Sequence, residues 1–205
     1  MTASLTLYSG KNTCALAVQI ALLEADAPHN VVWLDFAAQQ QRSAQYLAIN
    51  PKGRVPALVT EHGILSETPA LLFYVAQRFG AAQLAPLNNP FELARMQELM
   101  SYLASTVHVS HAHGRRAVRW ADEASSHADM QRKMPQNMID GFTVIEQNYL
   151  QGPWVLGDVY SVADAYLFTV ASWLKGDGVD IAQFPKVNAH TQRMLQRPAV
   201  LKALG

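Results

Sequence analysis

The chain contains a single cysteine, Cys14, in the stretch SGKNTCALAV that follows a short apolar run. A lone thiol cannot form an internal disulfide, so Cys14 is either a small buried hydrophobe or a reactive group. At the start of a helix, unpaired backbone N–H groups and the helix dipole would stabilise its thiolate. The residue by itself leaves both interpretations open.

Two further stretches could bind a polar ligand through the backbone. In the first, NPKGRVPAL (50–58), Val55 and Pro56 stand immediately before an expected strand. A cis bond at Pro56 would leave the N–H and C=O groups of Val55 facing outward, able to pair with an extended peptide as a sheet edge does. An ordinary trans proline at the start of a strand is the alternative.

In the second stretch, LSETPALL (65–72), Glu67 and Thr68 stand at the start of an expected helix. Free N–H groups and the positive end of the helix dipole make such a place a receptor for a carboxylate. Glu67 could then hold an ammonium group, while Thr68 and the neighbouring amides hold the carboxylate. Simple helix capping is the competing interpretation.

Three histidines gather in STVHVSHAHGRR, where His108 and His111 are spaced to share one helix face. Zinc needs three or four ligands, and neither a second cysteine nor an acid-rich partner accompanies them, so we expect no metal site. They are either exposed polar residues or one wall of a substrate site. A basic cluster follows beside Trp120, and we expect a solvated helix end there rather than a nucleic-acid patch. The cluster consists of Arg115, Arg116 and Arg119.

The elements that would position these residues alternate in type over the first eighty positions. The patterns predict strands over 4–8 and 30–36, a hairpin from VPALVT and GILS, and helices over 14–26, 41–50 and 67–79. The order β-α-β-α-β-β-α implies a mixed sheet with helices packed on it.

Strand patterns end near residue 80. Residues 81–89 are rich in turn formers and indicate a linker, and helical patterns occupy 91–116, 128–150, 161–174 and 184–204. Pro135 and Gly141 mark kinks or early-turn positions in the second of these helices. Ser161 and Asp164 form a capping-box pair with a role in folding. The sequence therefore predicts two domains, 1–80 and 90–205.

Composition excludes several classes of protein. Hydrophobic residues make up 50% of the chain and charged residues 16%, which is typical of a globular protein. The 16 basic and 16 acidic residues balance, so we expect no nucleic-acid or anionic-membrane partner. We find neither a secretory pattern at the N-terminus nor an apolar run long enough to span a membrane. With one cysteine, a cytoplasmic location is expected.

Four stretches in order together resemble a cytosolic glutathione S-transferase: LYSGKNTCALAVQIALLEA, NPKGRVPALV, GILSETPALLFYVA and GPWVLGDVYSVADAYLF. The cysteine followed by Ala-Leu-Ala is similar to the bacterial Beta class. The resemblance covers essentially the whole chain. It implies a thioredoxin-like N-terminal domain that binds glutathione, an all-helical C-terminal domain, and a homodimer, with glutathione as co-substrate and no separate cofactor.

The resemblance also implies roles for individual residues. Val55 and cis-Pro56 would pair with the cysteinyl backbone of glutathione, and Glu67 and Thr68 would take its γ-glutamyl end. Lys52 could pair with the glycyl carboxylate, whereas Arg54 is either a binding or a surface residue. The catalytic candidates are Cys14, Tyr8, Ser9 and His108, and the second-substrate candidates are Tyr102, His108 and His111.

This chain departs from the Beta-class pattern at several positions. The loop between Tyr8 and Cys14 is one residue longer, and Ala15 replaces a common serine. The positions that often carry Asn, Glu and Lys for glutathione contacts hold Ser101, Thr106 and Val109. The first long helix is therefore expected to contribute differently to the site.

The expected function is conjugation: the protein would stabilise the glutathione thiolate for attack on an electrophilic, small hydrophobic substrate. Cys14 raises an alternative, thiol transfer or disulfide reduction, in which it exchanges with a glutathione disulfide. A non-catalytic binder of glutathione or other ligands is the third interpretation, because one fold supports many activities.

Overall fold

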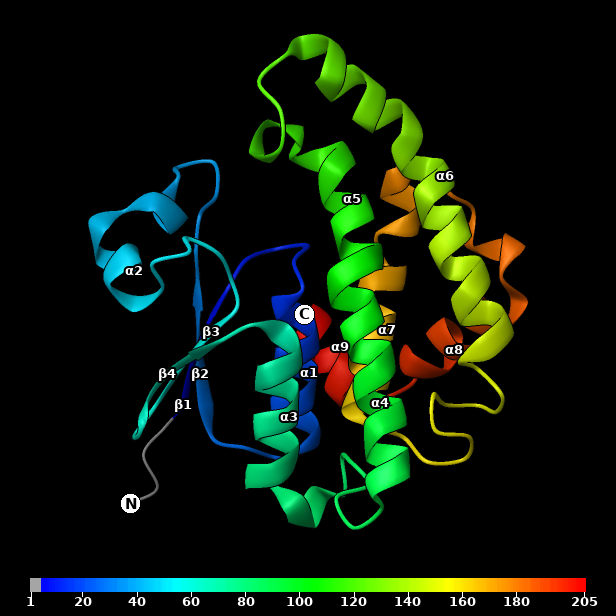
Figure 1. Ribbon diagram of the computed structural model, residues 1–205. Coiled ribbons are helices and arrows are strands. Elements are labelled where there is room, and N and C mark those ends of the chain that lie inside the picture. Colours follow the sequence, from blue (N-terminus) through cyan, green and yellow to red (C-terminus); the bar gives the residue numbers. More distant parts are fainter. Residues whose placement is uncertain (1–4) are drawn as a thin grey trace.

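The computed structural model describes residues 5–205, and its N-terminal part is built on a four-stranded sheet (Figure 1). The strand order is β2-β1-β3-β4, with β1 and β2 parallel and the other neighbours antiparallel. The strands are β1 (Leu5–Ser9), β2 (His29–Trp33), β3 (Ala57–Thr60) and β4 (Gly63–Ser66). The expected hairpin is confirmed. The strand expected to reach Phe36 ends at Trp33, and Ser4 of the first expected strand lies outside the described residues.

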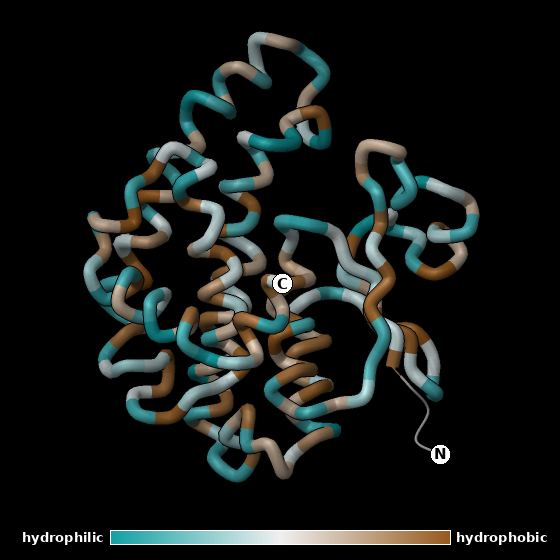
Figure 2. Tube along the Cα trace, turned by 180° about the vertical axis from the view of Figure 1, so that it is seen from behind, coloured by the Kyte–Doolittle hydropathy of each residue, from teal (hydrophilic) through white to brown (hydrophobic). Residues whose placement is uncertain are grey.

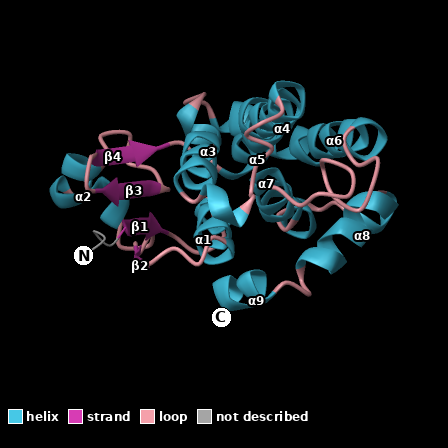
Figure 3. Cartoon of the chain, turned by 90° about the horizontal axis from the view of Figure 1, so that it is seen from below, coloured by secondary structure: helices cyan, strands magenta, loops and turns pink. Residues whose placement is uncertain are grey.

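Side chains of β1 alternate between the two faces of the sheet. Leu5 and Leu7 are fully buried, whereas Thr6 and Tyr8 are half-buried on the opposite face. The buried face is covered by α1 (Ala15–Glu24) and α3 (Thr68–Arg78), and α2 (Ala44–Ile49) lies on the other side of the sheet (Figure 3). The apolar face of β1 thus directs the two longer helices to one side of the sheet.

The rest of the chain is helical. Its long helices are α4 (Pro90–Tyr102), α5 (His108–Arg115), α6 (Ala124–Asn148), α7 (Val162–Ala171), α8 (Pro185–Met194) and α9 (Pro198–Leu204). One π-helical turn, Leu103–Val107, joins α4 to α5 within the predicted helix over 91–116. Short 3₁₀ turns cover Gln40–Arg42, Gly80–Ala82, Ala117–Arg119, Leu174–Asp177 and Ile181–Gln183.

The helix α6 runs without interruption through both positions expected to mark kinks or early turns. Pro135 lies inside the helix, so the early-turn interpretation is wrong for it. Gly141 serves a close approach, because a Cβ atom there would lie 3.2 Å from Cγ2 of Val107 in the π-helical turn. A side chain at position 141 would therefore push α6 away from the helix that carries the histidines.

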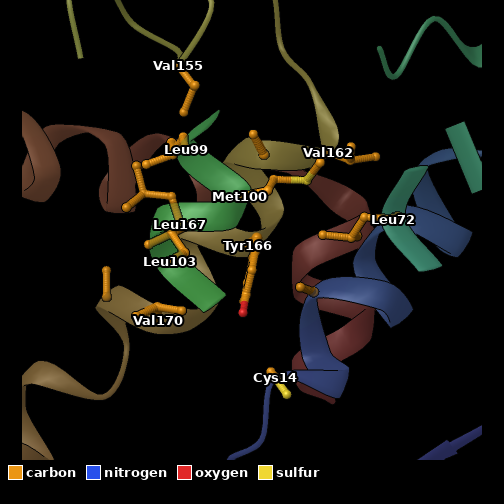
Figure 4. Packing of buried hydrophobic residues seen from close by; sticks show 14 of the residues in the cluster. Cys14, Leu72, Leu99, Met100, Leu103, Val155, Val162, Tyr166, Leu167 and Val170 are labelled. Carbon is orange, nitrogen blue, oxygen red and sulfur yellow. The ribbon is translucent and has the colours of Figure 1, made fainter. Parts of the chain in front are cut away.

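The core extends from the sheet into the helical part. Every residue of α7 is buried, and α7 packs against α1, α4 and α8. Figure 2 shows strongly hydrophobic stretches in the strands and in the helices packed beside them. In Figure 4 the cluster runs from Leu72 of α3 to Leu99 and Leu103, with Tyr166 of α7 pointing its hydroxyl toward the end where Cys14 lies. The two parts of the chain therefore share one core.

Candidate active site

A cavity of about 460 Å³ lies between the sheet part and the helices α5 and α7. Its lining includes eight of the residues singled out from the sequence: Cys14, Arg54, Val55, Pro56, Glu67, Thr68, His108 and His111. Ligand sites commonly have this size and this position between two structural units. The cavity therefore brings together residues that are far apart in the sequence.

Cys14 stands at the N-terminus of α1, as the N-cap residue, and is 7% exposed. Its Sγ donates to the carbonyl oxygen of Val55 at 3.7 Å. The neighbouring Thr13 forms the local turn, since its hydroxyl donates to the Gly10 carbonyl and accepts from the Ala15 N–H. This geometry holds the thiol at the cavity wall.

Burial raises the pKa of the Cys14 thiol above its ordinary value. A hydrogen bond with the Thr68 side chain and the charge of Arg116 act in the opposite direction and do not compensate. A thiolate stabilised by the helix N-terminus is one of the two interpretations of Cys14 that the sequence leaves open. The structure favours the protonated thiol instead, because removal from water costs more than these donors return.

The loop before β3 is built to present Val55. The Val55–Pro56 peptide bond is cis, as one of the two interpretations of this stretch required. The carbonyl of Arg54 accepts from the Tyr46 hydroxyl at 2.7 Å and from the Asn50 amide at 2.6 Å, which anchors the loop. The Val55 N–H donates to no acceptor within residues 5–205, so it is available to a ligand in the cavity.

Glu67 and Thr68 form the second polar edge. Thr68 is buried at the first position of α3, and Glu67 precedes it with φ of 74°, a conformation that costs energy for a residue with a side chain. Lys52 does not line the cavity; its ammonium pairs with the Glu67 carboxylate at 2.5 Å. This strained corner places the first amides of α3 toward the cavity region.

His108 lies half-buried on the cavity wall, with its ring 4.8 Å from that of Trp173. Burial lowers the pKa of His108 to about 4, and the positive charges of nearby groups, His111 and Arg116 first among them, act in the same direction. The imidazole is therefore neutral near pH 7. It can offer one N–H donor and one nitrogen acceptor, but no charge.

His111 is buried and held by a residue that the sequence did not single out. Its Nδ1 lies 2.7 Å from Oδ2 of Asp177, which is itself buried, and its ring stacks on Trp173 at 4.5 Å. Arg115 donates through Nε to the other oxygen of Asp177 at 3.2 Å. The carboxylate fixes the orientation of the imidazole that lines the cavity.

Four predicted site residues are not brought into the cavity, namely Lys52, Tyr8, Ser9 and Tyr102. Tyr8 points to the other face of the sheet and packs on Tyr46 with ring centroids 5.5 Å apart, because side chains alternate along β1. Ser9 is buried within the sheet. Tyr102 turns toward α6 and stacks on Tyr149 at 6.1 Å. Neither tyrosine lines the cavity, and the roles expected for them stay predictions that this geometry does not support.

The arginine cluster is solvated, as expected for a helix end, since Arg115 and Arg119 are exposed and Arg116 is half-buried. All three also line the cavity together with Trp120. Among the departures from the Beta-class pattern, Val109 lines the cavity, whereas Ala15 is fully buried in the core and Ser101 and Thr106 are exposed outside it. A serine hydroxyl at position 15 would therefore lie in the core and would not line the cavity.

Sequence reasoning missed several lining residues, among them Asn12, Phe36, Arg42, Asn50, Tyr166 and Trp173. Tyr166 is 1% exposed, and burial raises the pKa of its hydroxyl well above the ordinary value. A polar aromatic residue inside a mostly apolar helix is the available signal for Tyr166.

Two observations concern metal binding and membrane insertion. Among the described residues, no group of three or more His, Cys, Asp or Glu side chains is arranged to hold a metal ion. Within the same range, no helix combines the length and the apolar character needed to cross a membrane.

The fold and the cavity define a protein made of a four-stranded α/β part and an all-helical part that share one ligand site. Residues 3–77 match the family model of the glutathione S-transferase N-terminal domain, and residues 120–198 match that of the C-terminal domain. Glutathione S-transferase GstA from Escherichia coli O157:H7 is 27% identical over 201 residues, 97% of this chain and 96% of its own.

Solved structures agree with this match. A glutathione transferase homolog from Sulfitobacter, with bound glutathione, is 47% identical, covers 99% of this chain and 98% of its own, and has a TM-score of 0.96. A beta-class glutathione S-transferase from Sphingomonas chungbukensis is 29% identical, covers 97% and 96%, and has a TM-score of 0.85. The chain belongs to the glutathione S-transferase family. The expected fold class, a thioredoxin-like part with a helical part of this family's type, is confirmed.

Proposed function

We propose that this protein binds glutathione in the cavity and transfers its sulfur to an electrophilic substrate. The observation that carries the proposal is the unpaired Val55 N–H on the same cavity wall as Cys14 and the N-terminus of α3. An extended peptide needs such an N–H to dock as it would on a sheet edge. The Sulfitobacter relative, whose structure contains glutathione, supports the assignment of the ligand.

In the proposed complex, each end of the tripeptide meets a complementary group. The γ-glutamyl carboxylate would accept from Thr68 and the first amides of α3, and Glu67 would take the γ-glutamyl ammonium. Val55 would pair with the cysteinyl backbone. Arg54 and Arg42 are the cations at the sheet side of the cavity for the glycyl carboxylate, whereas Lys52, expected from the sequence to take it, pairs with Glu67 instead. This arrangement would direct the glutathione thiol toward Cys14.

The chemical step would begin with the glutathione thiolate, because the thiolate is the nucleophile. The protonated Cys14 thiol and the neutral His108 imidazole both line the cavity and would donate to that thiolate. The sulfur then attacks the electrophilic carbon, a C–S bond forms, and the leaving group departs with its bonding electrons. The activity is that of a glutathione S-transferase.

A second candidate function is supported by the presence of Cys14 on the cavity wall. Its thiolate would attack one sulfur of a glutathione disulfide, forming a mixed disulfide at Cys14 and releasing one glutathione thiolate. Attack by a second glutathione on the mixed disulfide would regenerate the Cys14 thiolate and release glutathione disulfide. Net reduction results where the disulfide attacked first joins glutathione to a different thiol, because that thiol is then the group released in the first step and glutathione disulfide is the oxidised product. The raised pKa of Cys14 makes this route slow at neutral pH.

Calorimetric titration with glutathione tests the proposal directly, beside turnover of an aromatic halide. Replacing Thr68 with valine keeps the shape and removes the hydroxyl, and we expect about tenfold weaker binding. Thr143→Val on α6, outside the cavity, is the matched control. Absence of glutathione binding by the unmodified protein would refute the proposal. Binding without turnover of any electrophile or disulfide would identify a non-catalytic binder.

We also propose a cytoplasmic homodimer, as is typical of the family. Large apolar side chains are exposed on the edge strand β4 and at the start of α4, namely Ile64, Leu65 and Phe91. Exposed apolar residues of this kind are common where a second copy binds. Light scattering of the purified protein should give twice the mass of 22.6 kDa.

A further inference from the structure

The wall of the cavity is strongly basic, although the chain as a whole carries no net charge. Five arginines and a single acidic residue, Glu67, line the cavity. The arginines are Arg42, Arg54, Arg115, Arg116 and Arg119. Over the whole chain, 16 basic and 16 acidic residues balance. The positive charge is therefore concentrated at this site.

Most of this charge is not neutralised by the protein. Arg115 is bound to Asp177, but the other four arginines form no ion pair with any acid within residues 5–205. Glu67 does not compensate them, because its carboxylate is paired with Lys52 at 2.5 Å. An uncompensated set of like charges around a cavity attracts anions.

The four arginines approach the cavity from two sides. Arg42 and Arg54 belong to the sheet part, whereas Arg116 and Arg119 stand at the end of α5 and in the turn that follows. Removal from water lowers the pKa of Arg119 to about 10, and repulsion by Arg116 and by both arginines of the sheet part acts in the same direction. Charges from both parts of the chain therefore act on one shared space.

The same helical side carries apolar side chains that are unusually exposed. Val118 is 73% exposed and Trp120 is 44% exposed, and both line the cavity beside Arg116 and Arg119. Phe36 lines it from the opposite side. An apolar or aromatic ligand body would be covered by these groups, while a charged end would meet the guanidinium groups.

We propose that the second substrate is an organic acid, an electrophile with an apolar body and a carboxylate that Arg116 and Arg119 bind. This inference rests on the proposed glutathione conjugation. The sheet-side cations are placed for the glycyl carboxylate of glutathione, which leaves the helical pair for a second anion. In the reaction the glutathione thiolate attacks a carbon that bears a halide, the C–S bond forms, the halide leaves with its electron pair, and the carboxylate remains paired with arginine.

The test compares chlorodinitrobenzoate with its methyl ester, which share one reacting carbon and differ in charge. For each, kcat/KM is divided by the uncatalysed rate constant with glutathione. We expect the acid to be preferred at least about tenfold at low salt, and the preference to fall as sodium chloride is added. In the double variant Arg116→Gln, Arg119→Gln the preference should fall about tenfold. Arg132→Gln, an exposed arginine of α6 outside the cavity, should keep it.

A binding measurement separates this inference from the proposed function. Dinitrobenzoate and its amide cannot be conjugated by halide displacement, and their binding to the glutathione-saturated protein is followed by tryptophan fluorescence. If the acid binds more tightly than the amide, the inference is supported even where neither chlorinated compound turns over. Absence of turnover would refute only the proposed conjugation. Equal binding of acid and amide, or an acid preference that survives both substitutions in a variant with native circular dichroism, would overturn it.

Discussion

The Sγ atom of Cys14 lies 3.7 Å from the carbonyl oxygen of Val55, which connects the N-terminus of α1 to the cis-proline loop. Only the protonated thiol can donate to a carbonyl, so this contact stabilises the same form that burial favours. Thr68 and Arg116 favour the thiolate and do not reverse the balance. The environment of Cys14 therefore controls its reactivity through the fraction of thiolate.

The first prediction concerns the reaction of Cys14 with glutathione disulfide. We expect a single glutathionyl adduct, reversible by reductant, whose rate of formation rises about tenfold for each pH unit between about pH 7 and 9, since the thiol pKa is raised. Intact mass spectrometry measures the adduct, and Cys14→Ala is the control. A rate that does not change with pH would show a low-pKa thiolate. No adduct, with glutathione still bound, would make Cys14 a bystander.

The second prediction concerns stability at acid pH. His108 has a pKa of about 4 in the folded protein, against an ordinary value of 6.5. Between these values the unfolded state binds a proton that the folded state does not, so stability rises with pH across this window and is lost as pH falls from 6.5 toward 4. In His108→Gln we expect the free energy of unfolding to fall by about 1–2 kcal/mol less over this pH range than in the unmodified protein. This figure allows for the partial exposure of the imidazole.

Urea denaturation at several pH values measures this effect as the difference between the unmodified protein and the variant. The difference removes contributions from other titrating groups. His62→Gln is the control, because its side chain is 81% exposed. Parallel stability curves for the unmodified protein and the His108 variant would contradict the lowered pKa.

The order of elements could be predicted from sequence because each element carries its own local pattern. Strand alternation in β1, turn formers at the β3–β4 hairpin and Pro69 in the first turn of α3 are all local signals. The end of β2 could not be predicted, because Phe36 is apolar yet leaves the sheet and packs against Gly10, where a Cβ atom would lie 2.6 Å from its ring. That contact depends on tertiary structure.

Part of the candidate site could be predicted for a similar reason. Cys14, Val55 and Thr68 stand at element boundaries, where sequence patterns are informative. The basic wall was missed because the charge of Arg116 and Arg119 was judged against the net charge of the chain, which says nothing about where charges gather. Tyr8 was misplaced because sequence proximity to Cys14 does not reveal the face of the sheet.

The third prediction concerns the contact between α5 and α6 at Gly114. A Cβ atom there would lie 2.8 Å from Cβ of Met134, which is too close to be relieved by rotation of the methionine side chain. We expect Gly114→Ala to lower the free energy of unfolding by about 1–2 kcal/mol, since overpacking exceeds the gain in helix propensity. Gly80→Ala, with its nearest atom at 3.9 Å, should be nearly neutral in the same thermal denaturation. Increased stability of the Gly114 variant would contradict the packing argument.

The fourth prediction concerns Asp164, a fully buried carboxylate. It accepts from the N–H groups of Val155 and Ser161, each at 2.8 Å, and lies 3.0 Å from Nε2 of His190. Asp164→Ala leaves these buried groups without a partner, so we expect a loss of about 3–5 kcal/mol in denaturant unfolding. Because Asp164 does not line the cavity, the kcat of the remaining folded protein should not change. A lowered kcat in fully folded protein would show that Asp164 acts on the site.

The fifth prediction concerns the contact that ties α9 to the end of α1. Arg197 donates from Nε and Nη2 to the two carboxylate oxygens of Glu24, at 2.6 and 2.8 Å, and its guanidinium lies 3.8 Å from the Tyr160 ring centroid. Lysine keeps the charge but can neither bind both oxygens nor stack flat on the ring. We expect Arg197→Lys to cost about 1–3 kcal/mol in thermal unfolding, whereas Arg132→Lys at an exposed pair should cost almost nothing. Equal effects of the two substitutions would show that charge alone holds α9 in place.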